Sequence, residues 1–299
     1  MTAASEAVEV RTYYDQPLLK EPVWKPEIPW YFFAGGMAGA AAPLAFGAGL
    51  RGNDALARRA WLVALAGASV SPVLLIKDLG RPERFYNMLR VFKVTSPMSV
   101  GSWALAAFGT TTGLSVLGVR PTRVAAAVLG PLVSTYTAAL VADTAIPVWH
   151  EARGELPLVF AASSAASAGA ALTLVTPARD AAPARRLAIA GAAAGLALMQ
   201  AMEDRLGELG EPYHEGEAGR YARAAKALTA AGSVTLAAFG SRSRAAGALG
   251  AAAVLAGAAC ERWSVFRAGF QSARDPKYVV TSQRKRVARR SDDAAAGAA

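Results

Sequence analysis

Asp78 stands beside several cations in the segment KDLGRPER (77–84), next to Lys77, Arg81 and Arg84. A carboxylate in such surroundings has two plausible uses. It forms ion pairs with its neighbours, or it accepts a proton beside a redox site, with an affinity set by burial against the nearby cations. The residues alone leave both interpretations open.

A second set of reactive side chains lies in YTAALVADTAIPVWHE (136–151). Tyr136 lies within an apolar run, where a phenol can donate a hydrogen bond to a carbonyl ligand such as a quinone head group. Asp143 follows seven residues later and is expected on the same helix face. His150 is interpreted either as a surface histidine or as a proton relay, and Trp149 is expected at a membrane interface.

Other ionisable residues give weaker signals. Glu203-Asp204-Arg205 and Glu261-Arg262 place opposite charges side by side, which predicts ion pairs at the ends of membrane helices. The chain has one Cys and two His. This composition leaves no disulfide framework and predicts neither a metal site nor a haem held by this chain.

The elements that position these residues are long and apolar. Hydrophobic residues make up 54% of the 299 residues and charged residues only 18%, with a mean hydropathy of +0.27. A transmembrane helix needs about 20 predominantly apolar residues. Stretches without Asp, Glu, Lys or Arg run through 28–50, 60–76, 94–119, 124–142, 156–178, 187–202, 227–241 and 245–260.

This pattern predicts an all-α integral membrane protein with eight transmembrane helices in a bundle and both termini on the same face. The net charge of +10 falls at the ends of the apolar runs and in the tail, so it indicates contact with membrane lipid and no nucleic acid. Lys and Arg occur in connectors on both sides, and we leave the orientation in the membrane open.

The domain organisation follows from these boundaries. We expect a polar N-terminal arm over 1–27, a membrane domain over 28–266 with an amphipathic loop at 78–98, and a basic, partly disordered tail over 267–299. The expected helices run over about 30–50, 59–77, 99–119, 123–145, 156–176, 185–203, 224–241 and 244–262.

Three segments carry a resemblance to a known family. DLGRPERFYNMLRVFKVTSPMSVGSWAL (78–105) resembles the signature of the NrfD/polysulfide reductase membrane-subunit family. YTAALVADTAIPVWHEARGELPLVFAASSAASAG (136–169) and SARDPKYVV (272–280) are also similar to its members. The resemblance implies an eight-helix core that anchors a ferredoxin-like iron–sulfur subunit and, through it, a molybdenum or tungsten pterin catalytic subunit.

The resemblance also implies roles for single residues. Asp78 matches the acidic residue near the quinone head group, and Tyr136 matches a tyrosine that hydrogen-bonds quinone. Arg81 and Arg84 match the loop that supports the site and meets the iron–sulfur subunit. Where the polysulfide reductase branch has Asn and His at the start of the first helix, this chain has PWYFF (29–33).

In place of that Asn and His, we expect Trp30 and Tyr31 to form an aromatic wall of the quinone pocket. The resemblance then implies a subunit of the bacterial inner (plasma) membrane that exchanges electrons and protons with menaquinone or ubiquinone. Asp78, Asp143 and His150 would handle the protons. The subunit itself is either non-catalytic or reacts with quinone. Two alternatives remain: a multi-helix transporter, and a structural anchor without a quinone site.

Overall fold

A computed structural model describes residues 18–280, and within that range the chain is helical and has no β-strand. Its long helices have 20 to 31 residues each. They are α1 (Glu27–Leu50), α2 (Asp54–Asp78), α4 (Pro97–Val116), α5 (Arg120–Ala142), α7 (Leu156–Val175), α8 (Ala182–Leu206), α9 (Gly216–Phe239) and α10 (Arg244–Arg274). The shorter ones are η2 (Pro82–Arg84), α3 (Phe85–Arg90), α6 (Pro147–Glu151) and η3 (Gly207–Tyr213).

Local sequence explains where several of these helices begin. Pro97 occupies the first turn of α4, where its missing N–H is not needed. Asn53, Ser96 and Ser243 cap α2, α4 and α10, each accepting a hydrogen bond from a backbone N–H in the first turn. These caps fix the connections between successive helices.

By length and composition, five of the long helices in the described range are suited to crossing a membrane: α1, α2, α5, α7 and α10. The other three have identifiable differences. α4 contains no charged residue but is rich in Gly, Ser and Thr, which lowers its hydropathy. α8 and α9 carry several charged residues near their ends. Over residues 18–280 the protein is therefore all-helical, with five candidate membrane spans.

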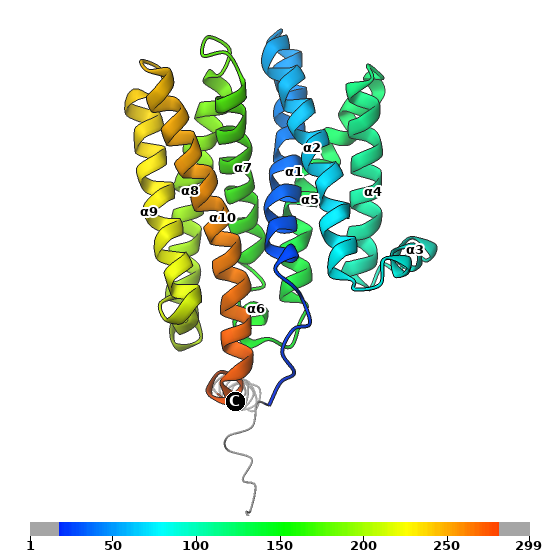
Figure 1. Cartoon of the computed structure of the whole chain (residues 1–299), viewed down its shortest axis with the longest axis vertical. Helices are drawn as coiled ribbons and strands as arrows, with labels where there is room; N and C mark the ends of the chain where they lie inside the picture. Colours follow the sequence, from blue (N-terminus) through cyan, green and yellow to red (C-terminus); the bar gives the residue numbers. More distant parts are fainter. Residues whose placement is uncertain (1–17, 281–299) are drawn as a thin grey trace, which may run out of the picture.

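The long helices form two groups side by side, with α1, α2, α4 and α5 on one side and α7, α8, α9 and α10 on the other (Figure 1). α1 lies at the junction, because it packs on α2 and α5 and also on α7 and α10. Its approach to α5 is close. A Cβ on Gly39 would lie 2.3 Å from the carbonyl oxygen of Gly130. Small residues therefore allow the two backbones to touch.

One end of the bundle carries α3, α6 and η3, and α2, α5, α8 and α10 all finish there (Figure 1). We call it the α6 end. The described segment before α1 also lies at this end. There, Nε and Nη2 of Arg274 donate hydrogen bonds to the Glu21 carboxylate at 2.9 and 3.0 Å. The pairing lowers the pKa of the Glu21 carboxyl.

The last helix is longer than the apolar pattern suggests. We expected it to end near 262 and assigned 267–299 to the tail, but α10 continues to Arg274. The reason is packing: Val265, Phe266, Ala268 and Gly269 are buried against the bundle even though charged residues interrupt the apolar run. The rest of the predicted tail, 281–299, and residues 1–17 of the predicted arm lie outside the described residues.

Candidate functional site

A cavity at the α6 end lies among the helices of the first group and the segment before them. Three of the chemically promising side chains line it: Tyr31 from α1, Asp78 from the end of α2, and Tyr136 from α5. Other parts of its wall are apolar, including Ile28, Phe32, Leu75, Met88, Met98 and Leu140. The fold thus brings Asp78 and Tyr136, which are far apart in sequence, to one apolar pocket.

Asp78 is the last residue of α2 and is partly buried. Its Oδ1 accepts a hydrogen bond from the backbone N–H of Lys25 at 2.8 Å. Lys77 turns to Glu27 instead, with Nζ 3.5 Å from Oε1. Asp78 has no ion pair with any described residue, so the ion-pair cluster considered from the sequence does not form. This leaves a carboxylate held by the backbone at the edge of a cavity.

Tyr136 is positioned by a glycine. Its ring packs directly on α4, where a Cβ on Gly101 would lie 1.9 Å from the ring. The residue is 8% exposed, and no hydrogen bond joins its hydroxyl to a described residue. Gly101 belongs to the sequence SPMSVGSWAL, and this contact gives that glycine a structural role. The phenol is left with an unused donor at the cavity.

Tyr31 supplies a second unused donor. It is almost fully buried in α1, and its hydroxyl has no hydrogen-bond partner among the described residues. Buried polar groups are nearly always hydrogen-bonded in native proteins. An orphan hydroxyl that lines a cavity indicates that a polar atom of a ligand or of water completes its bonding. Two phenols and one carboxylate therefore surround a space that is otherwise largely apolar.

An aromatic pair supports the outer side of the cavity. Trp24, which lines it, stacks on Trp149 with ring centroids 5.5 Å apart. Trp149 is fully buried, and its Nε1–H donates to the carbonyl oxygen of Val265 at 2.7 Å. Trp149 is therefore packed inside the protein and is not exposed to lipid. It ties the segment before α1 to α10.

Some of the expected site residues lie elsewhere. Trp30 is 46% exposed and contacts Phe33 and Trp263 rather than lining the cavity. Adjacent helical residues point about 100° apart, so Trp30 and Tyr31 do not form the single wall that we expected. Arg81 and Arg84 are exposed, at the start and end of η2, and neither lines the cavity.

The second half of the YTAALVADTAIPVWHE segment also departs from expectation. α5 ends at Ala142, and Asp143 is its non-helical cap residue, with φ −82° and ψ 40°. Asp143 is exposed. His150 lies partly exposed in α6. Neither residue lines the cavity.

A second polar cluster inside the other helix group was not predicted as such. Glu203 of α8 is buried and pairs with Lys226 of α9, with Nζ 2.6 Å from Oε2. Glu261 and Arg262 of α10 are also largely buried. The charge pairs were visible in the sequence, but the partner of Glu203 is on another helix, which no local pattern indicates. Within residues 18–280, no group of three or more His, Cys, Asp or Glu is arranged to hold a metal ion.

Comparison with known families decides the classification. A family model described as polysulfide reductase, of the NrfD type, matches residues 12–274. The chain belongs to the NrfD/polysulfide reductase family. A search of curated proteins found no match to it.

Membership in the NrfD/polysulfide reductase family confirms the resemblance drawn from 78–105. The family implies a multi-pass membrane subunit of a redox complex that interacts with quinone and associates with an iron–sulfur subunit and a molybdoenzyme catalytic subunit. The matched range includes every residue that lines the cavity of Asp78 and Tyr136.

Proposed function

We propose that this chain is the membrane subunit through which a multi-subunit oxidoreductase exchanges electrons and protons with quinone. The observation that carries the proposal is the meeting of Tyr31, Asp78 and Tyr136 at one cavity. Family membership supports the class of complex. A transporter or a plain anchor gives no reason for two phenol donors without partners beside a carboxylate.

The proposal includes a membrane arrangement. All eight long helices cross the bacterial inner membrane, and both termini lie on the side of the α6 end. α8 and α9 are included because charged side chains near their ends can extend along apolar surface toward the interface. Glu203, the deepest acidic residue of α8, is paired with Lys226, which lowers the cost of burying it.

The cavity residues fit a quinone head group. The walls are apolar, and the hydroxyls of Tyr31 and Tyr136 can each donate to a carbonyl oxygen. The free space of about 40 Å³ suits a few water molecules. A ring therefore requires side chains to move, and the flexible Met88 and Met98 are suited to this. Menaquinone or ubiquinone bound there would supply two-electron, two-proton redox chemistry.

Each residue of this chain then has a stated task. Tyr31 and Tyr136 orient the carbonyl groups. Asp78, held by the Lys25 N–H, gives or takes a proton at its carboxyl oxygen. Asp143 and His150 lie toward water at the α6 end and exchange protons with the solvent. Their exposure, rather than any contact with the cavity, supports this assignment.

The partner is proposed to dock at the α6 end. Arg81 and Arg84 are exposed there, and the exposed Tyr86 and Phe92 lie on and just after α3, which projects from the side of the bundle (Figure 1). A ferredoxin-like iron–sulfur subunit at this surface would be close to the cavity. A molybdenum or tungsten pterin subunit would bind through it. Exposed apolar and basic residues in one place are suited to a protein partner.

Tyr136→Phe is expected to raise the KM for quinone about fivefold in the purified complex. The substitution removes one hydrogen bond worth about 1 kcal/mol and leaves the ring packed on Gly101. Quinone-linked turnover at varied quinone concentration measures the effect. Tyr221→Phe, which changes a phenol of α9 outside the cavity, serves as the control. An unchanged KM in Tyr136→Phe would count against the assigned role.

A further inference from the structure

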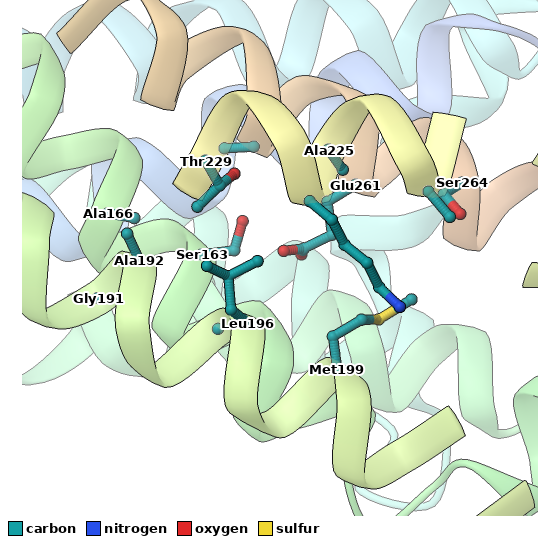
Figure 2. Close-up of a pocket in the computed structure, with 14 residues that line it drawn as sticks. Ser163, Ala166, Gly191, Ala192, Leu196, Met199, Ala225, Thr229, Glu261 and Ser264 are labelled. Carbon is teal, nitrogen blue, oxygen red and sulfur yellow. The ribbon is translucent and has the colours of Figure 1, made fainter. Parts of the chain in front are cut away.

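A second cavity lies among α7, α8, α9 and α10, and Figure 2 shows the side chains around it. Its wall is built largely from small and apolar residues, and only Lys226 and Glu261 among its lining residues ionise. Glu261 lies about 25 Å along α10 from Arg244 and about 20 Å from Arg274, at 1.5 Å per residue. An ionisable side chain at such a depth is a candidate functional group.

The groups around Glu261 have opposite effects on the ionisation of its carboxyl group. Its side chain is 13% exposed, and its Oε1 is buried without a hydrogen bond, 3.6 Å from Nη1 of Arg262. The carboxyl group points toward Ser163 of α7 across the cavity (Figure 2). Burial favours the neutral carboxyl, whereas Arg262 and the Ser163 hydroxyl favour the carboxylate. The free space of about 20 Å³ suits one water molecule between these groups.

A chain of ionisable groups connects this cavity with the α6 end. Lys226 contacts Glu203, and Oε2 of Glu203 is also 3.7 Å from Nε2 of His214. The side chain of Glu203 is 1% exposed, while that of His214 is 60% exposed. His214, which reaches water, is thus separated from the cavity by two side chains, those of Glu203 and Lys226.

One further titratable group faces this chain. Tyr213 of η3 is buried, and burial together with nearby Glu203 and Glu261 raises the pKa of its phenol. It therefore stays protonated. Arg262 of α10 pairs with Glu261, and Lys226 of α9 lines the same cavity and pairs with Glu203 of α8. Tyr213 of η3 lies near both carboxylates, and α7 offers the hydroxyl of Ser163. When His214 is neutral, the carboxylates of Glu203 and Glu261 balance the cations Lys226 and Arg262, so the cluster has no net charge.

The cluster also touches the wall of the first cavity. The guanidinium of Arg262 lies 3.7 Å from the ring centroid of Phe160, and its Nη2 donates to the Phe160 carbonyl oxygen at 2.9 Å. The Phe160 ring is 5.8 Å from that of Phe32, which lines the first cavity. A movement of Phe32 at the first cavity can therefore reach Arg262, the cation beside Glu261, because Phe160 packs on both residues.

We propose that Glu261 is a proton-binding site in the membrane interior, filled from the α6 end through His214, Glu203 and Lys226. The proton passes from the His214 imidazolium to the Glu203 carboxylate. The Lys226 ammonium gives a proton to the Glu261 carboxylate through water and regains one from Glu203. Arg262 couples the charge of Glu261 to the first cavity, so that quinone turnover changes the proton occupancy of Glu261, and the proton returns to the α6 end along the same groups. Only this coupling rests on the proposed function.

The proton site is tested on the full chain in lipid nanodiscs by infrared spectroscopy across mildly acidic to mildly alkaline pH. We expect a protonated carboxyl band that disappears in Glu261→Gln and shifts in Glu261→Asp. Glu217→Gln, which neutralises an exposed carboxylate on α9, should retain the band. In Lys226→Met the band should respond to a pH jump more slowly by roughly 10²-fold, because the proton donor is gone. A wild-type spectrum without the band, or a band that persists in Glu261→Gln, overturns the proton site.

The coupling is tested in the purified complex reconstituted into liposomes, with quinone turnover and proton movement measured together. We expect Glu261→Gln and Lys226→Met to lose the proton uptake and release that exceed the two protons of quinone chemistry, while Glu217→Gln retains them. The same excess in Glu261→Gln refutes the coupling. Absence of quinone turnover in the wild-type complex refutes the proposed function and the coupling with it, but leaves the infrared result on Glu261 standing.

Discussion

Asp78→Asn is expected to lower quinone-linked turnover of the purified complex by roughly 10²- to 10⁴-fold, the usual contribution of a positioned acid or base. Asparagine is nearly the same size, and its side-chain oxygen can still accept the hydrogen bond from the Lys25 N–H. The substitution therefore removes proton transfer and little else. Turnover and the KM for quinone should be measured together, because the loss is expected in kcat.

Two further variants make this test specific. Asp78→Glu retains a carboxyl group and should recover part of the lost turnover. Asp54→Asn changes an exposed carboxylate at the opposite end of α2 that does not line the cavity, and it should leave turnover unchanged. If Asp78→Asn turns over quinone at the wild-type rate, the carboxyl does not transfer the proton.

Gly101→Ala is expected to displace the Tyr136 ring and lower quinone-linked kcat/KM about tenfold. The added Cβ would overlap the ring, since it would lie 1.9 Å from Cε2. Extra atoms in a packed site typically cost about 1–3 kcal/mol. The ring must move, and its hydroxyl then leaves the position from which it donates. Turnover at varied quinone concentration and the Tm of the complex measure the two effects.

A matched control lies on the same helix. A Cβ on Gly109 of α4 would meet no atom within 4 Å, so Gly109→Ala should change neither property. The double variant Gly101→Ala/Tyr136→Phe distinguishes a specific effect from general damage. If Gly101 acts by positioning the Tyr136 hydroxyl, the two losses should be less than additive. Fully additive losses would show that Gly101 acts independently of that hydroxyl.

Much of the fold class could be predicted from the sequence, because long apolar runs require helices in a membrane. The all-helical architecture is confirmed. The specific block at 78–105 correctly indicated the family, which the match over 12–274 confirms. That all eight long helices cross the membrane remains part of the proposal. Length and hydropathy alone do not assign α4, α8 and α9 as membrane spans.

The site was partly accessible from the sequence. Asp78 and Tyr136 stood out because polar groups in apolar runs are costly, and the fold brings them to one cavity. The choice between Trp30 and Tyr31 could not be made. α1 is apolar around its circumference, so periodicity did not indicate which face turns inward. The exposure of Asp143 depended on where α5 ends, and helix ends are poorly determined by sequence.

The polar cluster in the second helix group could not be predicted for a different reason. Glu203 and Lys226 are 23 residues apart on antiparallel helices, and only tertiary packing joins them. The sequence therefore indicated neighbouring charges such as Glu261 and Arg262, but neither their burial nor the cavity between them. Local patterns identify candidate ionisable groups, while long-range contacts decide which of them face one another.

Photolabelling of the purified complex reports directly on whether quinone binds where Tyr31, Asp78 and Tyr136 meet. The purified complex is irradiated with a quinone that carries a photoreactive group on its ring, with and without excess unmodified quinone, and labelled peptides are identified by mass spectrometry. We expect displaceable labelling at the α6 end of α1, α2, α4 and α5. Displaceable labelling confined to α7–α10, or none on this chain, would show that quinone does not bind there.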